Sequence, residues 1–294
     1  MCGHGNSPSP PPSDNGSYEG SDDGSEGPTN PRYTPEELGA LFVDFYSFLT
    51  TLHYDQSDLK IPPPSGWPQI TPESCGHYKS DYAIQVLRHL PYFDSTCTAY
   101  IHFKSKLLDL TAFTLEDFEK HKDYHQGREF WSSEGELMDD SNVVCIAVGH
   151  ESFSRELWLN VMDCEIFEDF HAGDMLNAVP IETFFDNLKE QYETLKLIPG
   201  RNRITIEAEK VPEHDGRITE EAVKTQAEEW GTDLDIQYIR QVYRDYGWPE
   251  SFRFQEASNV IDDWLTPLGE GARGGPRELA WQQSPPDWDS TRWT

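Results

Sequence analysis

The feature that most constrains the fold is strand-type sequence between residues 142 and 170. It begins with "NVVCIAVG", a short apolar and β-branched run from Asn142 to Gly149 that is typical of a buried strand. Leu157, Leu159 and Val161 then alternate with Glu, Trp and Asn, the period of a strand that buries one face. "MDCE" supplies a turn, and "IFEDF" returns. The region therefore predicts a β-hairpin inside a sheet, with the leucines on the core face and the acidic residues in water.

Helical patterns flank this region on both sides. Thr34 is expected to cap a helix whose apolar residues recur at helical spacing as far as Leu52, and Ser80 to about Leu90 predicts a second helix. Pro180 opens a third amphipathic pattern, which Pro199–Gly200 is expected to stop. "LEDFEKHKDYHQGREFW" is interpreted as a polar helix or loop. "TEEAVKTQAEEWG", "DIQYIRQVYRDYG" and "SNVIDDWL" predict further helical segments near the C-terminus.

Composition divides the chain into five parts. Both ends are rich in Ser, Pro or Gly, and the N-terminal end has almost no apolar area to offset the entropy of ordering, so we expect both to be disordered. The predicted organisation is a disordered acidic tail (1–31), an α+β domain (32–200), a linker (201–217), a helical extension (218–268) and a flexible tryptophan-containing tail (269–294).

Negative charge is the strongest global signal. The chain has 53 acidic against 23 basic residues, a formal net charge of −30. Residues 1–30 contain five acidic and no basic residues, so 25 of the 30 excess negative charges belong to residues 31–294. Such a field repels nucleic-acid backbones and anionic lipid and attracts basic proteins. Solubility alone is the alternative explanation.

The cysteines suit a reducing compartment. They are odd in number and none forms a CxxC pair: Cys2, Cys75, Cys97, Cys145 and Cys164. The N-terminus has no secretory signal pattern, and no apolar window is long enough to span a bilayer. We therefore expect a cytoplasmic protein, with the nucleus as the alternative compartment.

A divalent-metal site is one hypothesis for the acidic hairpin. Its ligands would come from Glu165, Glu168, Asp169, His171 and Asp174. Adjacent strand residues point to opposite faces, so Glu168 and Asp169 are expected to diverge. A solvated hairpin surface is the preferred interpretation, and no metal site is predicted.

Other candidate chemistry is weak. Cys164 lies between acidic residues, which raise a thiol pKa and disfavour a nucleophile. Cys75 and His77 form a lone CxH pattern without a second ligand pair. No nucleotide-binding, hydrolase or zinc-protease motif is found. We therefore predict a non-enzymatic protein with no catalytic residue, no metal and no cofactor.

The order of segments from Asn142 to Leu195 resembles the SUKH superfamily, which includes fungal cell-wall synthesis regulators and bacterial toxin-immunity proteins. The segments concerned are "CIAVG", the hairpin "LWLNVMDCEIFED" and the helix pattern "IETFFDNLKEQY". Asn160 stands where the family often has Asp, and the glycine usual before the second hairpin strand is absent. The resemblance, which extends over about Tyr33 to Pro199, implies an α+β fold with a twisted, mainly antiparallel sheet and helices packed on one side.

Two classes of function follow. The first is a SUKH-like interaction or regulatory module that binds basic partner proteins through an acidic surface; a toxin-immunity protein, the family's bacterial role, is a separate alternative to it. The second is a hydrolase at the sheet edge, which needs at least two of His150, His171, Glu168 and Asp174 to converge in a pocket. The tail tryptophans, Trp281, Trp288 and Trp293, are expected either to anchor a partner or to fold back onto the protein.

Overall fold

The computed structural model describes residues 30–265, except 98, 103, 126, 132–134, 150–153, 171–173, 201–202 and 227–231. Almost all of the predicted N-terminal tail and the whole tryptophan-containing tail lie outside the described residues. His150 and His171 also lie outside them, and the side chain of Asp174 is not described.

The described chain has an α+β fold built on one antiparallel sheet, as predicted. Its strands are β3 (Tyr100–His102), β4 (Ser105–Leu107), β5 (Val143–Gly149), β6 (Arg155–Asn160), β7 (Glu165–Phe170), β8 (Asp174–Met175) and β9 (Val179–Pro180). They are ordered β3-β4-β5-β6-β7-β8, and β9 also pairs with β7. The predicted hairpin is β6–β7, in which Trp158 pairs with Phe167 and Leu159 with Ile166.

Two short antiparallel pairs lie outside this sheet. One joins β1 (Leu59–Lys60) to β2 (Tyr92–Phe93), and the other joins β10 (Leu197–Gly200) to β11 (Arg203–Glu207). The prediction that Pro199–Gly200 ends a helix is therefore wrong, because these residues are the end of a strand. The preceding helix ends at Glu193, and Leu195 turns the chain with a left-handed φ of 57°.

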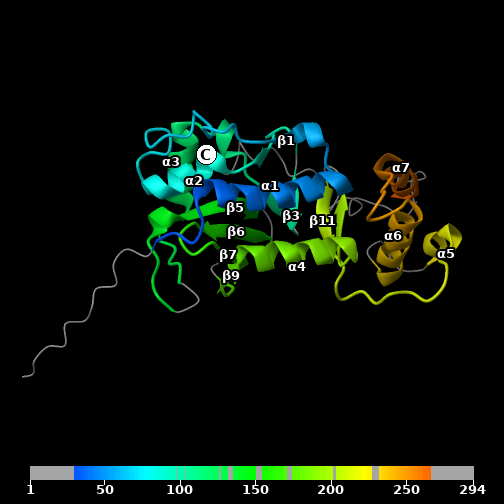
Figure 1. Cartoon of the computed structure of the whole chain (residues 1–294). Coiled ribbons are helices and arrows are strands. Elements are labelled where there is room, and N and C mark those ends of the chain that lie inside the picture. The colour runs from blue at the N-terminus through cyan, green and yellow to red at the C-terminus, as the bar shows by residue number, and fades with distance from the viewer. Residues whose placement is uncertain are drawn as a thin grey trace, which may run out of the picture. The chain divides into compact units, whose positions relative to one another are not determined.

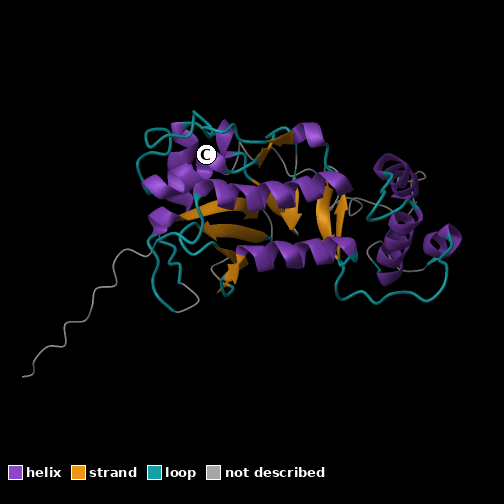
Figure 2. Cartoon of the chain, viewed as in Figure 1, coloured by secondary structure: helices purple, strands orange, loops and turns teal. Residues whose placement is uncertain are grey.

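Helices α1 (Pro35–Leu52) and α4 (Ile181–Glu193) lie side by side across one face of the sheet (Figures 1 and 2). Their contact is aromatic: the Phe45 and Phe185 rings are stacked with centroids 4.4 Å apart. Leu157, Leu159 and Ile166 from the sheet belong to the same buried cluster as these rings. The prediction that Leu159 lies on the core face is confirmed.

Local sequence explains where α1 begins and how closely its neighbour packs. Thr34 and Glu37 form a reciprocal capping box, and Pro35 occupies the first turn. Helix α2 (Asp81–His89), capped by Ser80, packs against α1. At their crossing a Cβ on Gly39 would lie 2.3 Å from the carbonyl oxygen of His89, so only glycine allows this approach.

A second buried cluster lies on the opposite face of the sheet. Its members are Phe130, Val143, Cys145, Val148, Trp158 and Phe167. Residues 127–131 and 135–139 cover part of this face, through Phe130 and Met138, and α3 (Leu115–His125) places the His121 ring 6.3 Å from the ring of Trp158. The sheet is thus buried on both faces, whereas the alternation in β6 predicted one buried face.

The helical extension consists of α5 (Glu220–Thr225), α6 (Asp233–Asp245) and α7 (Phe254–Leu265). Its buried apolar residues belong to the main core cluster. The buried guanidinium of Arg240 donates hydrogen bonds to the carbonyl oxygens of Leu195, Val211 and Ala208, at 3.0, 2.8 and 2.6 Å. These charge-assisted bonds tie α6 to the chain that follows α4.

Tyrosine hydroxyls form hydrogen bonds with backbone atoms of β3. The Tyr54 hydroxyl accepts a hydrogen bond from the Tyr100 amide at 2.6 Å and donates one to the Tyr100 carbonyl at 3.2 Å. The Tyr192 hydroxyl donates to the Ile101 carbonyl at 3.1 Å. β11 lies beside the same strand (Figure 1). Side chains thereby satisfy the amide and carbonyl of Tyr100 and the carbonyl of Ile101.

Candidate functional site

Two carboxylates lie opposite each other on the second face of the sheet. Glu156 of β6 and Asp169 of β7 are paired residues in the strand register, so their side chains emerge on the same side. They are 3% and 1% exposed. Burying two adjacent acidic groups is costly unless a cation compensates them.

Arg128 is that cation. One terminal nitrogen of its guanidinium donates to Asp169 Oδ2, and the other lies 3.0 Å from Glu156 Oε2. The guanidinium carbon is 5.5 Å from the centre of the Trp158 ring, within the range of a cation–π contact. We call Glu156, Asp169 and Trp158 the arginine cage. It combines two anionic acceptors with an aromatic surface.

Further polar groups lie around the arginine cage. The Cys145 thiol donates to the Ala147 carbonyl at 3.3 Å, and burial, reinforced by Glu156, raises its pKa. Burial lowers the pKa of His121 to about 3, with smaller contributions from Lys79 and Arg128. Burial also lowers the pKa of Lys79 to about 8. At neutral pH the His121 ring is therefore neutral and the Cys145 thiol protonated.

The prediction that the hairpin acids face water is wrong for Glu156 and Asp169. The sequence of residues 115–139 is mostly polar and therefore does not predict that it covers Glu156 and Asp169. Only a few apolar side chains there, such as Phe130, reach the sheet. The predicted divergence of Glu168 and Asp169 agrees with the structure. Glu168 forms an ion pair with Arg155, whereas Asp169 binds Arg128 on the other face.

Glu168 belongs to a second ionic group. Arg155 bridges it to Glu207, whose Oε1 lies 2.8 Å from an Arg155 nitrogen and 3.7 Å from His102 Nδ1. Burial, followed by the charge of Arg155, lowers the pKa of His102 to about 3. Of the four residues that the hydrolase hypothesis needs, Glu168 alone has a described side chain, and it is held by an arginine.

The remaining sequence candidates do not converge. Burial raises the pKa of Cys164 to about 11, so the expected direction is present but its main cause is burial, ahead of the neighbouring acids. Cys75 lies in the core and His77 is exposed, so the two residues of the CxH pattern lie in different environments. No group of three His, Cys, Asp or Glu side chains able to hold a metal occurs among the described residues.

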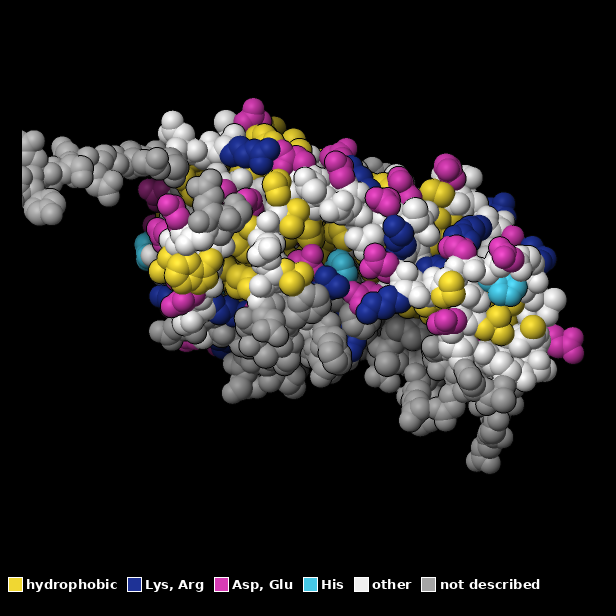
Figure 3. Space-filling model, turned by 90° about the horizontal axis from the view of Figure 1, so that it is seen from below, with side chains coloured by type: hydrophobic (Ala, Val, Ile, Leu, Met, Phe, Trp, Pro, Cys, Tyr) yellow, Lys and Arg dark blue, Asp and Glu magenta, His cyan; other side chains and the backbone are white. Residues whose placement is uncertain are grey.

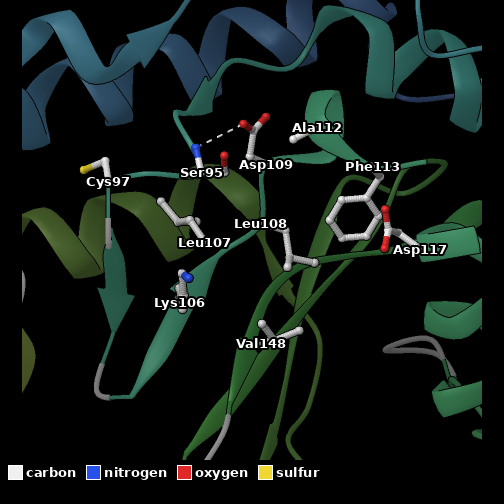
Figure 4. Close-up of a pocket in the computed structure, with 10 residues that line it drawn as sticks. All are labelled: Ser95, Cys97, Lys106, Leu107, Leu108, Asp109, Ala112, Phe113, Asp117 and Val148. Atoms are coloured by element: carbon white, nitrogen blue, oxygen red, sulfur yellow. Dashed lines mark hydrogen bonds between the residues drawn. The ribbon is translucent and has the colours of Figure 1, made fainter. Parts of the chain in front are cut away.

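A cavity of about 410 Å³ opens beside β4 (Figure 4). Leu107, Leu108 and Val148 give it an apolar lining, and Lys106 and Asp117 contribute charged groups. A third charged residue, Asp109, accepts hydrogen bonds from Lys60, Thr111 and the Ser95 amide, so its carboxylate serves the local structure. Asp117 likewise accepts hydrogen bonds from Thr114 at the start of α3.

The outer faces of α1 and α4 form an acidic surface. We call this surface the α1–α4 face; its exposed acidic residues are Glu36, Glu37, Asp44, Asp186, Glu190 and Glu193. α1 carries no Lys or Arg, and the single Lys of α4, Lys189, is paired with Asp44. Figure 3, which views the molecule of Figure 1 from below, shows acidic, basic and hydrophobic side chains interspersed on that side.

Comparison with known proteins gives no relative: no family model matches the chain, and no curated protein or solved structure is significantly similar to it. Within the described part of the chain, none of the helices combines the length and apolar character that crossing a membrane requires.

Sequence reasoning missed Arg128, which lies 41 residues from Asp169 in the chain. The local signal was slight. "GREFW" places one arginine beside two aromatic residues, in a segment without clear periodicity. Neither helical spacing nor strand alternation indicates a contact over such a separation.

Proposed function

We propose that this chain is an interaction module of the SUKH type that binds a basic partner protein through the α1–α4 face. The observation that carries the proposal is the pairing of two adjacent helices whose exposed charges are almost all acidic. Charge complementarity of this kind speeds association and selects basic partners. The same field disfavours nucleic acid and anionic membranes as direct partners.

Ion pairing within the chain strengthens the acidic excess. Most described Lys and Arg side chains already lie against acidic groups, such as Lys196 against Glu190 and Arg244 against Glu213. Exposed acids such as Asp186 and Glu193 therefore dominate the field that a partner meets. The segments that carry the SUKH resemblance form β5, the β6–β7 hairpin and α4, which is the order expected of such a module.

The proposed compartment is the cytoplasm or the nucleus. The four described cysteines are free, and three of them are buried. Buried free thiols are compatible with a reducing compartment.

The test reverses charge on the α1–α4 face. The face variant replaces Asp44, Asp186, Glu190 and Glu193 with Lys. The matched control replaces Glu209, Asp215, Glu221 and Glu250 with Lys, exposed acids that lie elsewhere. Both variants change the net charge by the same amount, so a general charge effect would act on both.

We expect affinity capture from cell extract to recover a basic protein on the wild type and on the control, and to lose it on the face variant. The captured protein should dissociate as salt is raised, because exposed charge interactions are screened. Equal recovery on all three chains, or equal loss from both variants, would contradict the proposal.

A further inference from the structure

The contacts of Arg128 have the form of a ligand in a binding site. A guanidinium is planar, always charged, and presents several N–H donors that match carboxylate acceptors. The arginine cage supplies a separate carboxylate to each terminal nitrogen and an indole beside the guanidinium carbon. An ammonium group would satisfy the charge but not this planar arrangement.

The arginine cage retains unused hydrogen-bonding capacity. Asp169 Oδ1 is buried and has no hydrogen-bond partner within the described structure. A buried carboxylate oxygen without a partner is unfavourable, so it is a position that a better-placed donor would improve. Arg128 therefore satisfies the charge of the site but only part of its hydrogen-bonding potential.

Arg128 is also the most exposed of the three charged side chains at the arginine cage. Its side chain is 23% exposed, against 4% and 1% for the side chains of Glu156 and Asp169. It comes from the connection after α3 and not from the sheet, and Gly127 before it has a left-handed φ of 86° with open space around it. Removal of the Arg128 side chain would therefore expose the two acids from outside.

Two large apolar residues close to Arg128 in the chain are exposed. Trp131 and Leu137 pair through an isolated β-bridge, and their side chains are 51% and 58% exposed. Adjacent large exposed hydrophobic residues are a feature of interaction surfaces. Trp131 and Leu137 therefore offer an apolar contact within ten residues of Arg128, which fills the arginine cage.

We propose that Glu156, Asp169 and Trp158 form an arginine-recognition site, that Arg128 fills it in cis, and that an arginine of a partner protein competes for it. Stability alone is a weak reason for this arrangement, since apolar residues in place of a buried ion group are often as stabilising. The site lies on the opposite sheet face from α1 and α4, so the inference does not depend on the function proposed above.

The first experiment removes the cis arginine and supplies its head group in solution. Arg128→Ala should lower the melting temperature by several degrees. Ethylguanidinium at millimolar concentration should restore most of that loss, and ethylammonium should need at least a tenfold higher concentration. Wild type should not respond to either compound.

Arg155→Ala is the matched control. Arg155 also bridges two acids of the same structure, Glu168 and Glu207, but the Glu207 side chain is 41% exposed, whereas both acids of the arginine cage are buried. Ethylguanidinium should not rescue this variant. Equal rescue of both variants, equal rescue by ethylammonium, or no rescue of Arg128→Ala would overturn the proposal.

A second variant covers the case in which Arg128→Ala does not fold. Arg128→Lys keeps the positive charge, and isothermal titration should detect saturable ethylguanidinium binding to it. Adding Glu156→Gln and Asp169→Asn to that variant should abolish the binding. Absence of saturable binding to Arg128→Lys would also reject the site.

Competition in trans is tested with a peptide. An acetylated pentapeptide with one central arginine between leucines should bind the Arg128→Ala chain at least tenfold more tightly than its citrulline counterpart, which keeps the shape but lacks the charge. It should bind wild type more weakly than the variant, because Arg128 occupies the site there. Equal affinity for the arginine and citrulline peptides would show that the site does not recognise arginine.

Discussion

The two faces of the sheet are both buried but differ in chemistry. The face under α1 and α4 is filled by apolar side chains, among them Leu157, Leu159 and Ile166. The opposite face sets Glu156, Asp169 and Trp158 around the guanidinium of Arg128. The first face tolerates variation in shape as long as it stays apolar, whereas the second requires specific partners. This difference separates the part of the sheet that supplies stability from the part that offers recognition.

The largest effect is expected on the apolar face. Leu159→Asp places a charge in the fully buried apolar cluster under α1 and α4. We expect a loss of several kcal/mol, comparable with the stability of a whole domain. Circular dichroism should show an unfolded chain at 25 °C. A cooperative urea transition within about 1 kcal/mol of wild type would invert the assignment of this face.

The next effect concerns the second face. Arg128→Ala leaves two buried carboxylates uncompensated and should cost about 3–5 kcal/mol in urea unfolding. Replacing all three charges with apolar residues, as Arg128→Met with Glu156→Leu and Asp169→Leu, should return stability to within about 2 kcal/mol of wild type. If the triple variant stays as unstable as Arg128→Ala, the ion group itself supplies essential stability and the contrast between the faces fails.

A smaller effect is expected on the loss of stability in acid. It compares one buried histidine from each side of the sheet. Burial lowers the pKa of His53, next to Tyr54 and Tyr192, to about 3, and the pKa of His121 is lowered to about the same value. The unfolded chain takes up these protons near pH 6.5, so stability is complete above that pH and is lost as pH falls toward 3.

His53→Phe should flatten the melting temperature between pH 6.5 and pH 4. At pH 7 its stability should stay within about 1 kcal/mol of wild type, because the two ring nitrogens of His53 have no hydrogen-bond partners among the described atoms. His121→Phe should likewise make the melting temperature vary less between pH 6.5 and pH 4. An unchanged pH profile in both variants would show that these histidines are protonated in the native state.

The smallest effect is expected from the N-terminus. Deletion of residues 1–29 should leave the melting temperature within about 2 °C of wild type, since the sequence offers no apolar area to bury there. The deletion keeps Arg32, which pairs with Glu182 and donates its amide to the Met162 carbonyl. A fall of many degrees would indicate that the tail covers part of the folded chain.

Elements with local signals could be predicted from the sequence. Thr34 with Glu37 marks the start of α1, Ser80 marks α2, and the apolar run after Asn142 marks β5. In each case the residues that define the element are close together in the chain, so spacing and capping suffice.

Features that depend on distant contacts could not be predicted. The alternation in β6 gives the two faces correctly, but whether the Trp158 face meets water depends on cover from residues 127–131 and 135–139. That cover has a polar composition, and its key contact, Arg128, lies far from Asp169 in the chain. The prediction for the end of α4 is wrong for a related reason. Leu197–Gly200 is a strand because β11 pairs with it, and the Pro-Gly signal does not indicate that pairing.

The tyrosine hydroxyls on β3 have a consequence for aggregation. An open strand edge offers free amides and carbonyls on which a foreign strand can grow, and it is a common starting point for fibrils. Here the Tyr54 hydroxyl occupies both the amide and the carbonyl of Tyr100, and Tyr192 occupies the next carbonyl. A second chain that added to this edge would have to displace two buried phenols first. The two tyrosines therefore oppose the growth of a foreign strand along Tyr100 and Ile101.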